Sequence, residues 1–253
     1  MIKDLTIIIP VKKYESSMDE LLLNAIKSCK DNKVILVGEN VTEFTKASES
    51  KNIKALETEC SSENTYQYNV NKAVETVDTE YFAVLEYDDK FSDIFEDTFN
   101  EYKGFENEDI FGYLHLTEIV DDEDKKTIGY ANEAFWASSF SERIGFVDIE
   151  SLGEYLNFNT SGAIFKTDKF KELGGLKESM KLVFWYEFLL RALYNGKKLF
   201  VIPKVGYYHL VNRTGSLSAI YAETLSEEEA DWWVDLAKKE YFFKNDRKKT
   251  YSE

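Results

Sequence analysis

The chain has 253 residues, of which 43% are hydrophobic and 15% aromatic, enough for one large α/β domain or two small ones. Its formal net charge of −16 at pH 7 argues against non-specific binding to nucleic acid or to anionic membranes, since both require a basic surface. Cys29 and Cys60 lack metal-binding spacing and favour a reducing compartment. No apolar run has the length of a signal peptide or a membrane span, so we expect a cytoplasmic protein.

Strand and helix patterns alternate through the N-terminal part of the chain. Continuous apolar runs predict buried strands at 5–9, 34–37 and 81–85, with a weaker strand at 53–57. Apolar residues at helical spacing predict helices over 18–29, 41–50 and 66–77. This alternation predicts a mostly parallel sheet with right-handed crossover connections.

The pattern is less regular after Asp89. We expect strands at 110–119, 158–166 and 199–202, the last of them stopped by Pro203, and helices at 91–102, 168–173 and 184–194. The segment 136–153 has no clear pattern and is expected to form a loop over a site. A capping box of Ser226 and Glu229 starts a final helix that reaches about Phe243, and the charged tail from Lys244 is expected to fray.

An acidic segment follows the apolar run at 81–85. Glu86 and Asp88 are two residues apart and, in an extended chain, point to the same side. Acids at the carboxyl end of a parallel strand lie where open α/β sheets bind ligands, and two carboxylates there could hold Mg²⁺ or Mn²⁺ beside phosphate oxygens. The alternative is that Asp88 and Asp89 only cap a helix that begins near Phe91.

Several short motifs follow one another along nearly the whole chain. They are the strand LTIIIPVKK, the strand VILVGEN, Asn71-Lys72-Ala73-Val74 followed by Thr79-Glu80-Tyr81, the acidic Glu86-Tyr87-Asp88-Asp89, the turn Leu173-Gly174-Gly175-Leu176, the helix Glu187–Arg191, and Tyr208-His209 with Arg213–Ser218. Together they resemble a family 2 glycosyltransferase with the GT-A fold. A final helix containing Trp-Trp is similar to small members carried by phages, which would place the protein in the host cytoplasm.

The resemblance implies a GT-A-like α/β fold: a Rossmann-type, mostly parallel mixed sheet flanked by helices, with a C-terminal helical extension. Residues 1–225 would form a single domain, with a nucleotide-sugar-binding half at 1–100 and an acceptor half at 101–225. Residues 226–253 would form the C-terminal helix and its charged tail. We expect both halves of the domain to share one continuous sheet.

The resemblance also implies a donor site at the carboxyl ends of the first strands. Asp88 and His209 would hold Mn²⁺ or Mg²⁺, which would offset charge on the departing diphosphate. Glu86 is a weaker metal ligand and would contact the ribose or a metal-bound water, and the alternative for His209 is an ordinary packed side chain. The residues expected to bind the donor are Pro10, Val11, Glu39, Asn71, Glu86, Arg213 and Ser216.

One departure from the family concerns the general base. Inverting members use an aspartate where this chain has Phe184-Trp185, neither of which accepts a proton. Glu187 is the nearest acid and the candidate catalytic base, yet on a helix it lies about 200° around from Trp185. Its alternative roles are a favourable carboxylate at a helix N-terminus and a partner for Arg191. Glu178 and Asp148 are further candidate bases. For Trp185 and Trp136 there are two alternatives: they stack on an acceptor sugar, or they belong to the core.

Three functions remain open at this point. The first is a metal-dependent, inverting hexosyltransferase that moves sugar from a nucleoside diphosphate, expected to be UDP, to an unknown acceptor. The second is a weak or inactive sugar-nucleotide-binding module on the same fold. The third, a nucleotidyltransferase, lacks the expected Gly-rich phosphate loop after the first strand. The many aromatic residues of the last helix predict a homodimer contact: Trp232, Trp233, Tyr241, Phe242 and Phe243.

Overall fold

The computed structural model describes residues 4–47, 52–59, 65–155, 158–213, 216, 221 and 223–250. Its strands are β1 (Leu5–Lys13), β2 (Lys33–Glu39), β3 (Ile53–Glu57), β4 (Tyr81–Val84), β5 (Lys90–Phe91), β6 (Ile110–Asp121), β7 (Thr127–Ala131), β8 (Phe146–Val147), β9 (Ile164–Lys166) and β10 (Lys198–Val211). Its α-helices are α1 (Asp19–Ser28), α2 (Val41–Ala47), α3 (Thr65–Thr76), α4 (Phe95–Tyr102), α5 (Ile149–Glu154), α6 (Thr167–Glu172), α7 (Phe184–Tyr194) and α9 (Glu227–Thr250). Short 3₁₀ turns occur at Ser16–Met18, Phe105–Asn107 and Glu133–Trp136.

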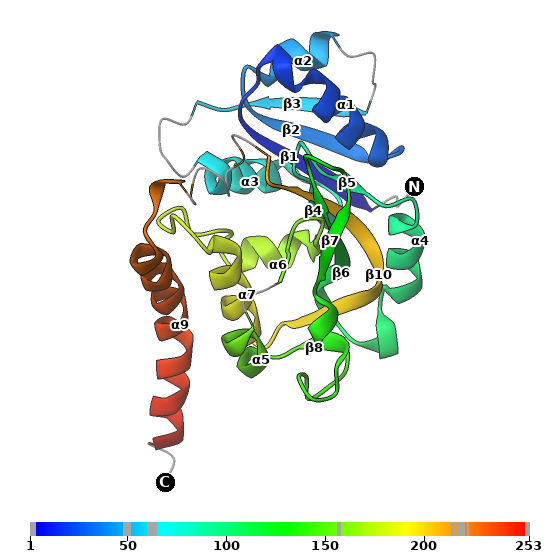
Figure 1. Cartoon of the computed structure of the whole chain (residues 1–253). Coiled ribbons are helices and arrows are strands. Elements are labelled where there is room, and N and C mark those ends of the chain that lie inside the picture. Colours follow the sequence, from blue (N-terminus) through cyan, green and yellow to red (C-terminus); the bar gives the residue numbers. More distant parts are fainter. Residues whose placement is uncertain are drawn as a thin grey trace.

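The strands form one mixed sheet in the order β3-β2-β1-β4-β9-β6-β10-β5, with β7 paired to β6 and β8 to β10 (Figure 1). β3, β2, β1 and β4 are parallel, so their carboxyl ends meet at one edge. Ile7 stands between Val34 and Ala83, and all three are buried because both faces of this part of the sheet are covered. The predicted mixed α/β fold is confirmed.

Helices cover both faces of the sheet, and each face has its own apolar core. On one face, residues of α1, α2 and α4 pack together, represented by Leu22, Phe44 and Phe99. On the other, α3, α5, α6, α7 and α9 contribute, represented by Val74 and Phe188. The molecule is therefore a three-layer sandwich, which leaves the strand ends as the place for a site.

Several element boundaries differ from the expectations. β10 does not stop at Pro203 but continues to Val211, because an irregularity in the pairing between Ile202 and Val205 accommodates a residue without an N–H. The strand expected at 158–166 is limited to β9, and the unassigned segment 136–153 contains β8 and α5. α4 begins at Phe95 because the preceding residues 90–91 pair with β10.

α9 forms the C-terminal extension and projects beyond the body of the molecule (Figure 1). Ala237 and Tyr241 are buried against α7, whereas Trp232 and Leu236 are 53% and 40% exposed. The helix runs to Thr250 rather than fraying from Lys244, since lysine and arginine are good helix formers and suit the negative end of the helix dipole. Among the helices of the described residues, none is both long and apolar enough to cross a bilayer.

Candidate active site

A cleft of about 910 Å³ opens at the carboxyl ends of β1 and β4, between the end of β10 and the start of α7. The sequence predicted ten residues as catalytic base, donor contacts or metal ligands. Seven of them line the cleft: Pro10, Val11, Glu86, Asp88, His209, Arg213 and Ser216. The cleft also contains three lysines, Lys12, Lys13 and Lys181. In a chain of net charge −16, this gathering of cations favours an anionic ligand.

The close approach of β2 to the end of β1 shapes one side of the cleft. A Cβ added at Gly38 would lie 2.2 Å from the Val11 carbonyl oxygen, so only glycine fits there. The glycine at position 38 therefore allows the end of β2 to lie close against the backbone of β1. Glu39 itself lies outside the cleft lining and pairs with Lys13 at 3.0 Å.

Glu86 is held at the floor of the cleft by a tyrosine that the sequence analysis did not single out. The Tyr66 hydroxyl donates to Glu86 Oε1 at 2.6 Å, and Trp185 Nε1 lies 3.4 Å from the same hydroxyl. Burial raises the pKa of Glu86 to about 8; the Tyr66 hydrogen bond acts against this, and the charges of Asp89 and Asp88 add to it. A lone tyrosine at the start of a helix belongs to no motif, so its role could not be predicted from the residue pattern.

Asp88 faces the cleft and carries a partner from the end of β10. Arg213 Nε donates to Asp88 Oδ2 at 2.6 Å, and the guanidinium lies 4.9 Å from the centre of the Tyr87 ring, whose hydroxyl it also contacts. Burial and the charge of Asp89 raise the pKa of Asp88, against the opposing effect of Arg213. Ser216 lies on the same segment, whereas Ser218 lies outside the described residues.

Asp89 ties the acidic loop to β10. Its carboxylate is buried and accepts from the Tyr207 hydroxyl at 2.8 Å, the Leu210 N–H at 2.7 Å and His209 Nδ1 at 2.9 Å. The acids therefore do not cap a helix, and α4 has no side-chain cap at Ile94. Burial acts to lower the pKa of His209, but its hydrogen bond to Asp89 and the surrounding carboxylates outweigh this and raise it.

A divalent cation fits this arrangement with few protein ligands. Because the Asp89 carboxylate is an acceptor, it holds the His209 proton on Nδ1 and leaves Nε2 as a potential ligand. Asp88 supplies a carboxylate beside it in the same cleft. Within the described residues, no three His, Cys, Asp or Glu side chains converge as a metal cluster. One or two side chains plus phosphate oxygens and water match the usual coordination of Mg²⁺.

Asn71 does not reach the cleft. Its side chain brackets Leu176, donating to the Leu176 carbonyl at 2.9 Å and accepting from the Leu176 N–H at 2.8 Å. Arg191 Nη2 donates to the Gly175 carbonyl at 2.7 Å from the other side. The expectation that Asn71 binds the donor is not supported by this placement, and the residue instead fastens the Gly-Gly turn to α3.

Glu187 also points away from the cleft. It is 1% exposed and pairs with Lys177 and Arg191, each at 2.8 Å, and with the Tyr241 hydroxyl of α9. These residues form the α7–α9 hub: Lys177, Glu187, Arg191 and Tyr241. The placement does not support Glu187 as a catalytic base, because the turn of the helix directs Phe184 and Trp185 to the cleft and Glu187 to the interior.

The other candidate bases are engaged elsewhere. Asp148 caps α5 by accepting from the Ser151 N–H at 2.7 Å, and Glu178 lies 3.3 Å from the Asn71 amide. Trp136 belongs to the core, where its Nε1 donates to the Val201 carbonyl at 3.0 Å. Trp185 lines the cleft and stacks on Phe165 with an interplanar angle of 11°.

The backbone just before α7 is unusual. Val183 has φ of +52°, a left-handed conformation that is costly for a β-branched residue. It directly precedes Phe184 and Trp185, which line the cleft. Such strain persists only where the surrounding structure imposes it and is frequent at functional sites.

Neither a protein-family model nor a curated protein matches this sequence. Solved structures do match. Residues 1–349 of TarS from S. aureus in complex with UDP-GlcNAc align with a TM-score of 0.66 and 14% identity, over 93% of this chain and 66% of that one. Longer TarS gives a TM-score of 0.58 at 14% identity over 94% and 43% of the two chains. The mannosyltransferase PcManGT from Pyrobaculum calidifontis, in complex with GDP-Man and Mn²⁺, gives 0.59 at 14% identity over 84% and 58%.

This likeness confirms the predicted GT-A-like fold. The chain spans less than two thirds of the length of each of these three structures. At such identity the fold is what is shared, and the activity has to be argued from the cleft itself.

Proposed function

We propose that this protein is a glycosyltransferase of the family 2 type that uses a nucleoside-diphosphate sugar. The observation that carries the proposal is the convergence of Asp88, His209 and Arg213 in one cleft at the carboxyl ends of β1 and β4. That is where open α/β sheets bind nucleotides. The fold is shared with two proteins whose structures hold UDP-GlcNAc and GDP-Man, which supports the same class of donor here.

The polar residues divide the work of holding a diphosphate. Arg213 offers a guanidinium that suits phosphate oxygens, and Lys12 and Lys13 add positive charge at the end of β1. Asp88 and His209 Nε2 would hold Mn²⁺ or Mg²⁺. When bound, the cation would offset the negative charge that develops on the departing nucleoside diphosphate. Tyr66 fixes the Glu86 carboxyl, which we assign to the donor sugar or ribose.

The resemblance favours a UDP-linked donor and inversion at the anomeric carbon. The second candidate function is a sugar-nucleotide-binding module with little turnover. One observation favours it: aromatic Phe184 and Trp185 face the cleft, while the nearest acid on α7, Glu187, is locked in the α7–α9 hub. Loss of a positioned base slows transfer by roughly 10²–10⁴-fold without removing donor binding.

A donor screen tests the proposal. Release of nucleoside diphosphate is measured for a panel of UDP- and GDP-sugars, with Mn²⁺ and with EDTA. We expect turnover of one donor that requires metal and falls about 10²–10³-fold in Asp88→Ala. Asp97→Ala, which removes an exposed acid of α4, is the matched control and should behave as wild type.

Other outcomes of the screen are equally informative. Metal-dependent nucleotide binding without turnover would favour the binding module. Release of pyrophosphate would indicate a nucleotidyltransferase. Neither binding nor turnover with any donor would contradict the assignment of the cleft.

A further inference from the structure

The aromatic residues of α9 that were expected at a dimer contact separate into groups. Tyr241 is buried and Trp233 is partly buried, and both pack on the body of the molecule. Trp232 is 53% exposed. The side chains of Phe242 and Phe243 lie outside the described residues. Among the described aromatic side chains of the helix, Trp232 is therefore the one available to a partner.

Trp232 belongs to an exposed apolar pair on the outer side of α9. Leu236, one helical turn further on, is 40% exposed. Because each residue turns the helix by about 100°, Trp232 lies about 180° around from Tyr241, which hydrogen-bonds Glu187 of α7. Figure 1 shows α9 at the edge of the molecule, with the body on one side of it. Packing on α7 therefore does not account for the outer pair.

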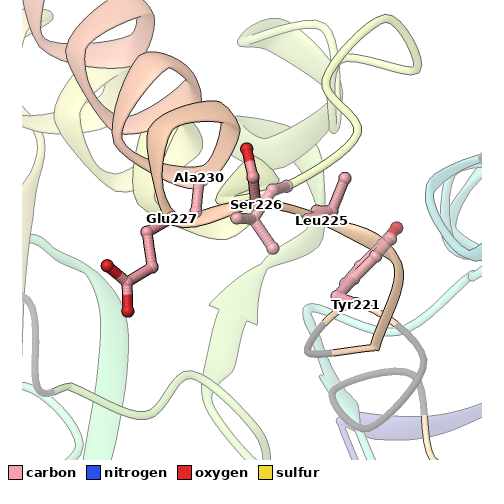
Figure 2. A pocket seen from close by; sticks show the side chains of 6 residues that line it. Tyr221, Leu225, Ser226, Glu227 and Ala230 are labelled. Carbon is pink, nitrogen blue, oxygen red and sulfur yellow. The ribbon is translucent and has the colours of Figure 1, made fainter.

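The body also holds the start of α9. A hollow of about 350 Å³ lies between the first turn of α9 and the segment before α7, and is lined by Leu182, Tyr221, Leu225, Ser226, Glu227 and Ala230 (Figure 2). Beside it, Glu229 lies 3.6 Å from Lys181 Nζ. The helix is thus fastened along its inner side from the first turn to Tyr241, and its outer side is presented as a fixed surface.

The charges of α9 are divided along its length. Residues 227–237 contain five acids and no lysine or arginine, whereas residues 238–250 contain six basic residues and two acids. A second copy of the same helix, running in the opposite direction, would set the acidic half of each against the basic half of the other. A copy running in the same direction would set like charges side by side, which is unfavourable. The charge pattern thus fits an antiparallel copy of this helix.

The exposed residues of the outer side fit one register of such a pair. In a two-fold pair, a residue i that contacts residue j of the partner implies that j contacts i. Placing Trp232 against the partner's Leu236 sets residues 228 and 229 opposite the partner's Lys239 at both ends. Glu228 and Lys239 are exposed and lie within about 40° of Trp232 around the helix. The same register thus joins an apolar centre to opposite charges at its ends.

We propose that the outer side of α9 is a homodimer surface on which a second copy of this chain packs in the antiparallel direction. Trp232 of each copy packs on the partner's Leu236, and Glu228 pairs with the partner's Lys239. The two bodies lie on opposite sides of the helix pair, because each holds its own α9 by the side away from Trp232. None of these residues lines the cleft, so the contact is independent of the donor chemistry.

Sedimentation velocity of the full chain over a range of concentrations tests the association. We expect a dimer that dissociates on dilution. Trp232→Ala should raise the dissociation constant about 30-fold or more, because tryptophan at the centre of an interface carries much of the binding energy. Leu236→Ala keeps the contact between Trp232 and Trp233 and should also weaken association. Ile128→Ala, which removes a 58% exposed apolar side chain of β7, is the matched control and should leave the dissociation constant unchanged.

Charge reversals test the direction of the pair. Glu228→Lys or Lys239→Glu alone places like charges opposite each other at both ends of the dimer, and should raise the dissociation constant about 10-fold. A mixture of the two variants forms opposite-charge pairs at both ends of a heterodimer. Its dissociation constant should therefore return close to that of wild type. Far-UV circular dichroism of each variant should show wild-type helix content, which separates lost association from lost folding.

Three results would overturn the proposal. A wild-type chain that stays monomeric up to about 100 µM would leave the outer side of α9 to a partner of another kind. A dimer that neither Trp232→Ala nor Leu236→Ala weakens would place the contact elsewhere on the molecule. A mixture of Glu228→Lys and Lys239→Glu that associates no better than either variant alone would contradict the antiparallel pairing.

Discussion

Two carboxylates of this molecule, the half-buried Glu86 at the cleft and the fully buried Glu187, differ in their surroundings. Glu86 has a phenol as its hydrogen-bond donor and two further acids nearby, and burial raises its pKa to about 8. Burial also acts to raise the pKa of Glu187, but hydrogen bonds from Arg191, Lys177 and Tyr241 outweigh it and hold that pKa below its usual value. The ionised form of Glu86 is therefore disfavoured, whereas the negative charge of Glu187 is balanced by its hydrogen-bond and ion-pair partners.

The difference separates a site from a support. A buried acid with a structural role is surrounded by cations and hydrogen-bond donors that balance its charge, because an unpaired buried charge destabilises the fold. At the cleft the charge is left partly uncompensated, which is where a ligand or cation can add stabilisation. By this criterion Glu187 belongs to the framework that fastens α9 to α7, and Glu86 to the site.

The largest expected effect would come from breaking the hub. Glu187→Ala leaves Arg191 and Lys177 without their shared buried partner, so we expect a loss of about 3–5 kcal/mol in the free energy of unfolding, measured in urea. Glu172→Ala, which removes an exposed pair with Lys169, should cost under about 1 kcal/mol. A small stability loss combined with a large loss of turnover would restore the catalytic role of Glu187.

The contrast also explains what could be predicted from the sequence. The placement of most cleft residues could be predicted, since Pro10 and Asp88 lie at or just after the ends of apolar strands whose parallel pairing brings those ends together. The positions of Glu39 and Asn71 outside the cleft lining could not be predicted, because their side chains bond to neighbours that only the tertiary fold supplies. The helical spacing already indicated that Glu187 lies about 200° around the helix from Trp185. Its partner Tyr241 could not be predicted, because it lies 54 residues further along the chain.

The next effect concerns the uncompensated acid. The folded pKa of Glu86, about 8, is above its ordinary value of 4.5, so its contribution to stability is present below pH 4.5 and lost as pH rises towards 8. Glu86→Gln removes this loss and keeps an acceptor for Tyr66. We expect the variant to gain about 2–3 kcal/mol over wild type at pH 8 in urea unfolding, and little at pH 5. Asp97→Asn, on the exposed side of α4, should show no such pH-dependent gain. A gain that is equal at both pH values would contradict the assignment.

His115 extends the comparison to a buried polar group with neither compensation nor a cleft. Within the described residues both of its ring nitrogens lack hydrogen-bond partners, and burial lowers its pKa to about 3. Its contribution to stability is therefore present above pH 6.5 and lost as pH falls, because the unfolded chain then takes up the proton first. The sign is opposite to that of Glu86, so the two variants separate the two effects. We expect this histidine to cost wild type about 2 kcal/mol between pH 7 and pH 5, and His115→Leu to remove that loss in urea unfolding. An unchanged pH slope in His115→Leu would show that the ring finds a hydrogen-bond partner in solution, and it would then belong with Glu187 among the compensated groups.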